Sequence, residues 1–452
     1  MKIRIAALVC AALATQPPRV ATAQNTITRQ DSTVDMRSIL HEEDHGGLRI
    51  TSGKTYNRVE GLPVLFGPTY RNRIGSADLS LSAFGILRSA QAFHWDADNI
   101  GHKVTAELRY GRRRGFSFGA ESFDVVAPIE PWQLNEPDAG LAAFFLKRDY
   151  FDYFGRHGTR GYVSAFTAGG ATITAGFSDE RWSSRSARDV FTLFRDNDNW
   201  RINPQINDGR VHVASLNFDL DTRTSEINPW AGWLINANYE HATGVTTDAS
   251  ARAGTAISRD ASYGRGFVDI RRYNRISPKR QINGRLVLGG WLHGDELPLE
   301  RRFSVGGIGT LPGFDFRRVG IGTDVGQCAA DNSRLEGRPA QCSRVALAQV
   351  EYRHELVSEL FDVFNRNGIR VRGAVFRVKP TAVVFVDAGR GWLVGERQGT
   401  LRYPSGAVPG FDTFRTDVGG GLDLGLLGIY VAKAVSSSKE PANFFVRIRD
   451  RF

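Results

Sequence analysis

The most specific chemical pattern in the chain lies near its N-terminus. Residues His41, Glu42, Glu43, Asp44 and His45 fit the H-E-x-x-H motif, in which two imidazoles one helical turn apart bind zinc and the glutamate activates water. Zinc proteases embed this helix in a large domain that supplies a third ligand, whereas the surrounding segment is short and polar. A charged, solvated tail is the favoured interpretation, and we expect no metal site.

The remaining motifs offer no better case for catalysis. Gly307-x-Gly309 and Gly320-x-Gly322 resemble nucleotide-binding loops in spacing, but neither follows a buried strand and opens a helix. A lipase-like arrangement of scattered His, Ser and acidic residues is conceivable, yet no spacing demands one. We therefore expect no catalytic residues, no cofactor and no enzymatic activity.

The first 23 residues predict export. Lys2 and Arg4 precede an apolar run, and Ala21-Thr22-Ala23 offers a cleavage site before Gln24, which is the layout of a secretory signal peptide. No later stretch has the roughly 18 consecutive apolar residues of a membrane helix. Residues 24–55 are polar and are expected to form a short periplasmic tail, with one possible helix over 31–45.

The net charge indicates which kinds of molecule the protein could bind, and the cysteines indicate whether it could form a disulfide. The formal net charge of +10 comes mostly from scattered arginines, which suits a polar lumen or contact with anionic lipid and lipopolysaccharide rather than nucleic acid. After signal cleavage only Cys328 and Cys342 remain. They lie 14 positions apart in one predicted outer loop, so a loop-closing disulfide is expected in an oxidising compartment.

From residue 56 onward the chain breaks into strand-length segments rich in aromatic and β-branched residues, separated by Gly, Asn, Asp and Pro. This pattern predicts an all-β fold, a 16-stranded antiparallel transmembrane β-barrel over residues 56–452. The expected strands are 57–71, 78–88, 102–111, 115–126, 142–154, 160–168, 170–178, 209–222, 228–243, 262–275, 280–293, 344–355, 381–392, 414–426, 428–436 and 443–452.

The final segment shows the strand period most clearly. Phe444, Val446, Ile448 and Phe452 share one face, and Arg447, Arg449 and Arg451 share the other. An arginine facing hydrocarbon costs roughly 2 to 4 kcal/mol near the midplane, so we expect the arginine row to face the lumen and the apolar row to face lipid. A terminal aromatic residue after such a row is similar to the signal that outer-membrane insertion machinery reads.

Connection lengths support the barrel. With both termini in the periplasm, the long connections 179–208, 244–261, 294–343 and 393–413 fall outside, and very short ones fall inside, as in outer-membrane barrels. Three expected inner connections, 89–101, 127–141 and 356–380, are too long for this rule. The last contains apolar residues at helical spacing over 355–364, which predicts a small amphipathic helix that packs at the rim or docks a partner.

Residues 301–316 form the most distinctive loop. Gly306, Gly307, Gly309 and Gly313 fall within eight residues, which disfavours helix and strand and suits a tightly bent backbone lying close to other backbone. Phe303 and Phe314 add two apolar anchors. The pattern of Phe303, Gly306, Gly307, Leu311, Gly313 and Phe314 resembles the sixth extracellular loop of the bacterial surface antigen family, which includes outer-membrane assembly factors and two-partner secretion transporters.

A second motif of that family, Phe-x-Asp-x-Gly, is present as Phe385, Asp387 and Gly389. Pro312 replaces the loop arginine that pairs with this aspartate in the family. Because Arg317 and Arg318 follow closely, we expect one of them to pair with Asp387 inside the barrel.

The resemblance implies that the Gly-rich loop folds into the lumen as a plug. It also implies a role in protein insertion into, or translocation across, the outer membrane, with client proteins and the insertion machinery as partners. The first and last strands, 59–71 and 443–452, would form the seam. Family members also carry periplasmic POTRA domains, for which this sequence leaves no room. The alternatives are a passive pore or structural barrel, and an outer-membrane enzyme that uses the His41 to His45 tail.

Overall fold

A computed structural model describes residues 46–52, 55–91, 99–194, 199–226, 228–247, 258–317, 342–356, 369–371, 374–376, 380–395, 404–425, 427–448 and 451–452. The long strands are β1 (Gly46–Ser52), β2 (Pro63–Ile74), β3 (Ala77–Arg88), β4 (Ile100–Tyr110), β5 (Gly115–Pro128), β6 (Tyr153–Phe166), β7 (Ala171–Ser184), β8 (Gly209–Asp221), β9 (Gly232–Thr247), β11 (Tyr263–Ser277), β12 (Arg280–Gly294), β13 (Arg344–Glu355), β16 (Thr381–Trp392), β17 (Arg415–Asp423), β18 (Leu427–Ala434) and β19 (Asn443–Ile448).

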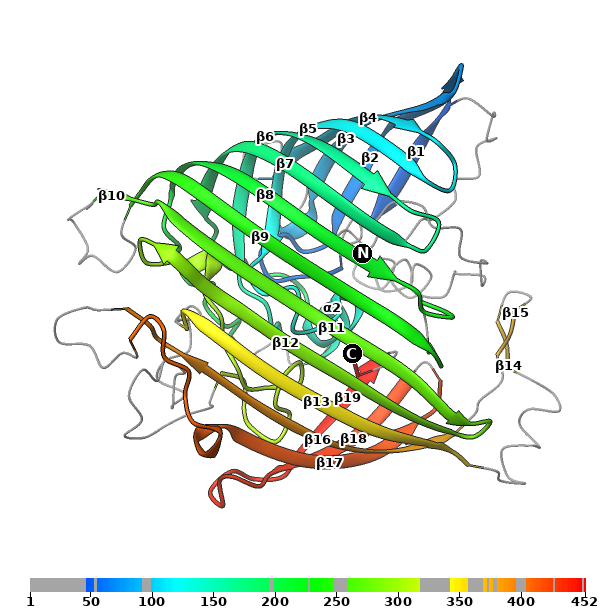
Figure 1. Cartoon of the computed structure of the whole chain (residues 1–452), viewed down its shortest axis with the longest axis vertical. Coiled ribbons are helices and arrows are strands. Elements are labelled where there is room, and N and C mark those ends of the chain that lie inside the picture. Colours follow the sequence, from blue (N-terminus) through cyan, green and yellow to red (C-terminus); the bar gives the residue numbers. More distant parts are fainter. Residues whose placement is uncertain are drawn as a thin grey trace.

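These 16 strands form one antiparallel sheet that curls around an interior (Figure 1). Each long strand pairs with the next one along the chain, from β1 on β2 to β18 on β19, and the short β10 (Ser258–Asp260) pairs with the end of β9. Within the described residues, no register joins the two terminal strands β1 and β19. The predicted count of 16 strands is confirmed, and the sheet has an open seam between its first and last strands.

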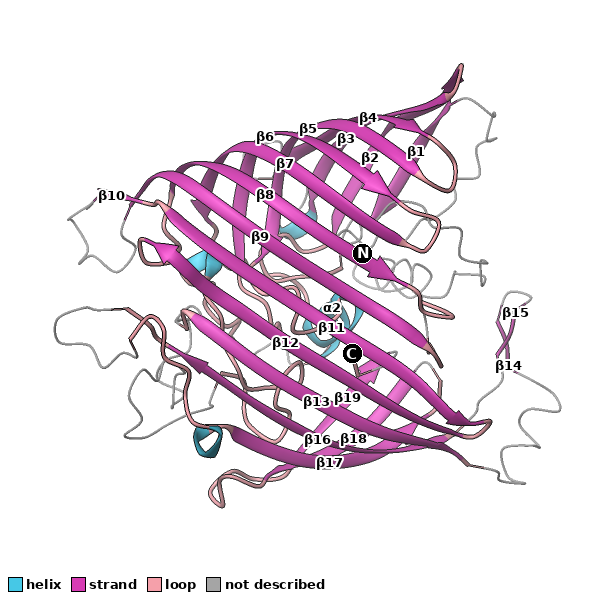
Figure 2. Cartoon of the chain, in the orientation of Figure 1, coloured by secondary structure: helices cyan, strands magenta, loops and turns pink. Residues whose placement is uncertain are grey.

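Shorter elements sit at the ends of the sheet or inside it (Figure 2). They are the helix α2 (Glu136–Leu146), the 3-10 turns η1 (Ser89–Gln91), η2 (Leu299–Arg301) and η4 (Phe411–Thr413), and the separate hairpin of β14 (Ile369–Val371) and β15 (Ala374–Phe376). No helix in the described ranges is long and apolar enough to cross a membrane.

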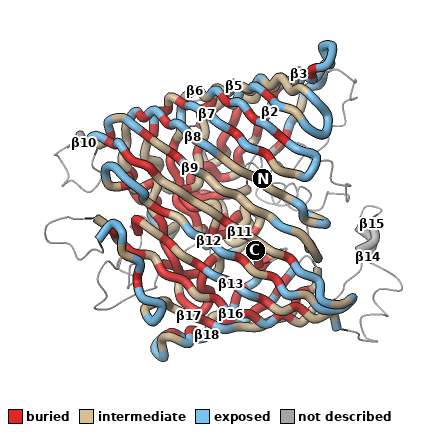
Figure 3. Tube along the Cα trace, viewed as in Figure 1, coloured by how far each residue is buried: buried red, intermediate tan, exposed pale blue. Residues whose placement is uncertain are grey.

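Burial alternates along the strands (Figure 3), and the exposed positions are mostly apolar whereas many buried ones are charged. Outward positions such as Val104, Phe118 and Leu288 are 42 to 50% exposed, although they are apolar. Inward positions include charged residues that are almost fully buried, such as Arg285 and Glu351. Only a sheet with hydrocarbon outside and polar groups inside favours this distribution.

The strand β1 was not expected. Residues Gly46–Ser52 pair with β2 over seven positions, so the sheet begins ten residues before the predicted boundary at 56, inside the segment assigned to a polar tail. The seam therefore lies between β1 and β19, and the prediction that residues 59–71 form its first edge is wrong.

The expected strand 142–154 is also wrong. Its first half belongs to α2, which begins after Asn135, whose side chain accepts a hydrogen bond from the backbone N–H of Asp138. Pro137 lies in the first turn, and Lys147 ends the helix in a left-handed conformation. These are standard helix boundary signals, and they outweigh the apolar run that suggested a strand.

The two errors explain most of the connections that broke the length rule. Adding β1 and removing the strand 142–154 leaves the number of strands at 16. Each strand between these two positions then crosses the membrane in the direction opposite to the predicted one. Connections 89–99 and 129–152 then fall at the same end as the long connections, whereas 75–76, 111–114 and 167–170 fall at the end with the short turns. Only 356–380 remains long at that end, and its predicted helix lies mostly outside the described residues.

Candidate functional site: the lumenal plug and the seam

The described part of the Gly-rich loop lies inside the barrel, as predicted. Phe303, Leu311 and Phe314 are at most 3% exposed and belong to one apolar cluster with inward strand residues such as Val287 and Leu347. The ring of Phe303 stacks on that of Phe267, with ring centroids 6.1 Å apart, and the guanidinium of Arg265 lies 4.6 Å from its centroid. The apolar anchors of the motif therefore hold the loop against the inner wall.

The backbone conformation explains why two positions of the loop motif are occupied by glycine. Gly306 and Gly307 have φ angles of 106° and 101°, a region that residues with a Cβ atom rarely adopt. Gly307 forms a bridge with Leu311, and the hydroxyl of Thr310 accepts a hydrogen bond from the Gly306 N–H at 2.8 Å. The double glycine thus folds the loop tip into a compact turn.

This tip reaches the last strands of the sheet. The Gly313 N–H donates to Asp417 Oδ2 at 2.7 Å, Asn443 Nδ2 donates to the Pro312 carbonyl at 3.0 Å, and Gln349 Nε2 donates to the Thr310 carbonyl at 2.9 Å. These partners lie on β17, β19 and β13. The loop is therefore anchored to the inward faces of three strands in the C-terminal part of the sheet.

Substitution of Gly313 by alanine tests whether these contacts hold the loop tip in place. A Cβ atom on Gly313 would lie 2.5 Å from Asp417 Cβ and 2.7 Å from the backbone nitrogen of Ala434, so strand backbone would have to move. We expect Gly313→Ala to displace the tip and to raise the rate of protease cleavage near residue 315 about tenfold or more in the folded barrel. Gly161→Ala, where a Cβ would meet open space, is the control, and equal cleavage of both variants would contradict the seat.

Asp387 does not pair with Arg317, one of its two predicted partners. Its carboxylate accepts a hydrogen bond from Arg451 Nη2 at 2.5 Å, and the Arg451 guanidinium carbon lies 3.5 Å from the ring centroid of Phe385. Arg451 comes from the C-terminal end of the chain, which turns into the interior. Gly389, the third residue of this motif, packs where a Cβ would be 3.4 Å from the loop residue Val305. Arg451 therefore supplies the cation that Pro312 cannot.

Arg317 instead joins a buried ionic cluster near the long-connection end. Its Nη1 lies 2.5 Å from Asp152 Oδ2, and its Nη2 lies 3.3 Å from Glu130 Oε2. Asp152 also pairs with Arg58 at 2.9 Å and with Arg201 at 2.7 Å. The cluster links the loop to segments that precede β2, β6 and β8. Arg318, the other predicted partner of Asp387, lies outside the described residues.

The two acids of this cluster differ in pKa. Burial raises the pKa of Glu130 to about 7, although Arg317 and the hydrogen bonds from Ser304 oppose the change. Burial also acts on Asp152, but the guanidiniums of Arg201, Arg317 and Arg58 outweigh it and hold the pKa of Asp152 well below its usual range. Asp152 is thus the permanent anion of the cluster, and Glu130 is its titrating member.

The Glu130 pKa predicts a pH dependence of loop seating. Because the raised pKa means that the seated loop favours the protonated acid, its stabilisation is complete below about pH 4.5 and falls as the pH rises to about 7. The loss is at most about 3 kcal/mol. We expect cleavage near residue 315 to increase between pH 5 and pH 8 relative to Glu130→Gln, which lacks the ionisation. Parallel profiles for the two proteins would contradict this assignment.

The helix α2 covers the end of the last strand. Asp138 accepts hydrogen bonds from the backbone N–H of Ile448 and from Arg447 Nε, the latter at 2.5 Å, and Asn135 Nδ2 donates to the Ile448 carbonyl at 3.2 Å. Side chains from the N-terminus of α2 thus occupy both backbone polar groups of Ile448. We call this contact of Asn135 and Asp138 with β19 the seam clamp.

The C-terminal residues divide between the two faces. Phe444 and Val446 are exposed, at 65% and 43%, and Ile448 ends β19. Phe452 does not continue this outward row, because β19 stops at Ile448 and Phe452 is 7% exposed. Its carbonyl accepts a hydrogen bond from the hydroxyl of Tyr273 at 2.7 Å. The expected strand to residue 452 is therefore wrong at its end, and the insertion-signal role of these residues stays a prediction.

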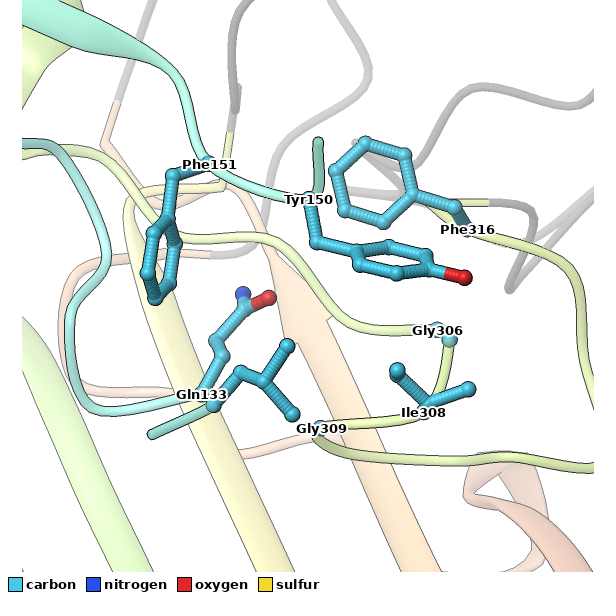
Figure 4. A pocket seen from close by; sticks show the side chains of 9 residues that line it. Gln133, Tyr150, Phe151, Gly306, Ile308, Gly309 and Phe316 are labelled. Carbon is cyan, nitrogen blue, oxygen red and sulfur yellow. The ribbon is translucent and has the colours of Figure 1, made fainter. Parts of the chain in front are cut away.

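A small gap separates the loop tip from the connection that carries α2 (Figure 4). Its lining includes Gln133, Tyr150 and Phe316 together with the backbone of Gly306 to Gly309. The ring of Tyr150 packs edge to face on that of Phe316, with centroids 5.8 Å apart. The two inserted segments therefore pack on each other, and they fill this part of the lumen.

Two other features predicted from the sequence are not placed. His41 to His45 and Cys328 lie outside the described residues, so the solvated His41 to His45 tail and the disulfide between Cys328 and Cys342 stay predictions. Cys342 is buried, and its backbone pairs with that of Phe303. Among the described residues no group of three or more His, Cys, Asp or Glu side chains is arranged to hold a metal ion.

A single antiparallel sheet with an apolar exterior, a charged interior and an inserted loop defines a transmembrane β-barrel. The sequence profile of the Omp85 superfamily domain matches residues 213–426, which run from β8 to the turn after β17. These residues are therefore similar to an Omp85 superfamily domain, in agreement with the resemblance noted from the loop and strand motifs, and the chain is a bacterial outer-membrane protein.

Several solved structures match the chain at low identity. BamA from Haemophilus ducreyi lacking POTRA domains 1–3 is 14% identical, with a TM-score of 0.48, over 97% of this chain and 80% of that chain. CdiB from Escherichia coli is 12% identical, with a TM-score of 0.37, over 90% and 62% of the two chains. CdiB from Acinetobacter baumannii is 10% identical, with a TM-score of 0.37, over 89% and 58%. The chain spans less than two thirds of either CdiB, and no curated protein matches its sequence.

Proposed function

We propose that this barrel assists the insertion of proteins into the outer membrane or their translocation across it. The Omp85 superfamily domain supports this class of function. The observation that carries the proposal is the open seam, because the described residues of β1 and β19 do not pair with each other. Unpaired edge strands present backbone donors and acceptors to which another strand can add.

The seam has two different edges. On β1, Leu48 and Ile50 are 55% and 50% exposed, so this edge is an apolar strand facing lipid. On β19, the seam clamp holds the backbone groups of Ile448. The plugged lumen near the seam also favours a protein-handling barrel over a wide passive pore.

Reconstitution tests the proposal. We expect liposomes that contain the purified full chain to accelerate the insertion of an unfolded outer-membrane barrel protein severalfold, measured as the heat-modifiable folded band on a gel. A translocation arm follows protection of an unfolded exported polypeptide from external protease. Liposomes with an equal amount of a porin are the control. If neither rate exceeds that of the porin liposomes, the protein-handling function is wrong.

A further inference from the structure

An arginine-rich turn projects from the end of the barrel that carries the short connections. Residues Arg112, Arg113 and Arg114 join β4 to β5, and all three are exposed. No described carboxylate forms an ion pair with any of them. Three adjacent guanidiniums without an acidic partner repel one another, so they favour an anionic ligand.

The turn holds these arginines in a fixed shape. Gly111 has a φ angle of 89°, and a Cβ at this position would lie 2.1 Å from the Arg114 carbonyl oxygen. The backbone thus closes tightly on itself at Gly111, as a short hairpin connection requires. The three exposed arginines therefore all lie within one short turn.

The neighbouring hairpin adds further cations. Asp78 on β3 is in register with Arg109 on β4, which places the β2–β3 turn beside the β4–β5 turn at the upper right of Figure 1. Arg71 and Arg73 are exposed near the end of β2, on the strand face opposite to Tyr70 and Ile74. Asp78, about half exposed, lies 3.9 Å from Arg73. The corner therefore holds six arginines against one aspartate within residues 70–79 and 109–116.

Aromatic side chains line the outer face beside the turn of Arg112 to Arg114. Phe116 and Phe118 are each 50% exposed, and Tyr70 is 41% exposed. Tyr110 and Phe116 have ring centroids 5.7 Å apart, and Phe116 and Phe118 have centroids 5.9 Å apart. An exposed aromatic band next to exposed arginines is the arrangement expected where hydrocarbon gives way to lipid head groups.

We propose that this corner, at the turn of Arg112, Arg113 and Arg114, binds the phosphate groups of anionic phospholipids. Short turns of outer-membrane barrels face the periplasm, and the periplasmic leaflet consists of phospholipids. The planar guanidinium fork matches phosphate oxygens in a bidentate manner, which a lysine ammonium does not reproduce. The aromatic band holds the acyl chains beside the same turn. This lipid site is independent of the seam and of the proposed protein handling.

Lipid retention by the purified full chain tests the site. Native mass spectrometry would count phosphatidylglycerol and phosphatidylcholine molecules that stay bound after transfer from mixed micelles. We expect the triple substitution Arg112→Gln, Arg113→Gln and Arg114→Gln to lower phosphatidylglycerol affinity at least about tenfold, because each surface cation contributes roughly 1 kcal/mol toward an anionic lipid. Phosphatidylcholine retention is expected to be unchanged.

The matched control neutralises two exposed cations at the opposite end of the barrel, Arg181→Gln with Lys439→Gln, and should retain phosphatidylglycerol like the unmodified chain. A second arm replaces lipid with glycerol phosphate, which we expect to compete weakly because it lacks acyl chains. Equal phosphatidylglycerol retention by the triple variant and the control would overturn the proposal. So would unchanged lipid retention with loss of a co-purifying acidic protein, since the corner would then be a protein docking site.

Discussion

Asp152→Ala is expected to release the Gly-rich loop from the barrel interior and to destabilise the folded protein by about 3 to 5 kcal/mol. Asp152 lies within 2.9 Å of three guanidiniums, those of Arg58, Arg201 and Arg317. Its removal leaves three buried or half-buried positive charges close together, with Glu130 and Asp149 as the remaining anions. Because Arg317 belongs to the loop, the loop is the segment that we expect to move.

Two measurements follow this change. Cleavage by protease near residue 315 should rise strongly in the folded barrel, and conductance in planar bilayers should show larger and more frequent openings. Asp179→Ala is the matched control. It also removes an aspartate side chain from an ion pair, but this pair with Arg210, 2.6 Å between Oδ2 and Nη2, lies on the surface. A variant at position 152 that behaves like the control would show that the ionic cluster does not hold the plug.

Asp138→Ala is expected to detach α2 from β19 and to free the edge of the last strand. The substitution removes the Asp138 carboxylate from the buried guanidinium of Arg447 and from the Ile448 N–H. Breaking a buried ion pair from one side costs on the order of 3 to 5 kcal/mol. We expect hydrogen exchange at residues 443–448 to become at least about tenfold faster, while exchange in β7 and β8 stays unchanged.

The conservative substitution Asp138→Asn separates the two contacts of the seam clamp. Its amide oxygen can still accept from the Ile448 N–H, but it carries no charge for Arg447. Exchange should therefore fall between that of the unmodified chain and that of Asp138→Ala. If α2 only fills space, both variants should exchange like the unmodified chain, and the clamp would have no role at the seam.

Much of the barrel could be predicted because strand alternation is a local property. Phe444 and Val446 face outward and Arg447 faces inward, as the energetic cost of an arginine in hydrocarbon requires. The burial of Phe303, Leu311 and Phe314 followed from a loop motif that is itself local in sequence. These features depend on residues close together in the chain, which a sequence displays directly.

The errors arose where local patterns were weak or ambiguous. The strand β1 contains two glycines and only two outward apolar residues, Leu48 and Ile50, so its segment resembles a polar tail. In α2 the apolar run masked the cap formed by Asn135 and Pro137. One missed strand and one false strand cancel in the total of 16, so the strand count alone does not reveal either error.

The candidate site was predicted least well because its contacts are remote in sequence. Arg451 and Asp387 are 64 positions apart, and Arg317 and Asp152 are 165 apart. Nothing near Asp387 distinguishes Arg451 from the arginines of the loop as its partner. Asn135 and Asp138 carried a usable signal, since they mark the start of a helix, but their contact with β19 depends on how the connection folds into the barrel.

The central claim is that the chain handles proteins at the seam between β1 and β19, and site-specific photo-crosslinking in living cells tests it most directly. A photoreactive residue at Ile50 on β1 is compared with one at Val104 on β4, which has similar exposure but lies inside the sheet. The account predicts adducts with newly exported polypeptides at Ile50 and none at Val104. Equal labelling at the two positions, or labelling by lipid alone, would contradict it.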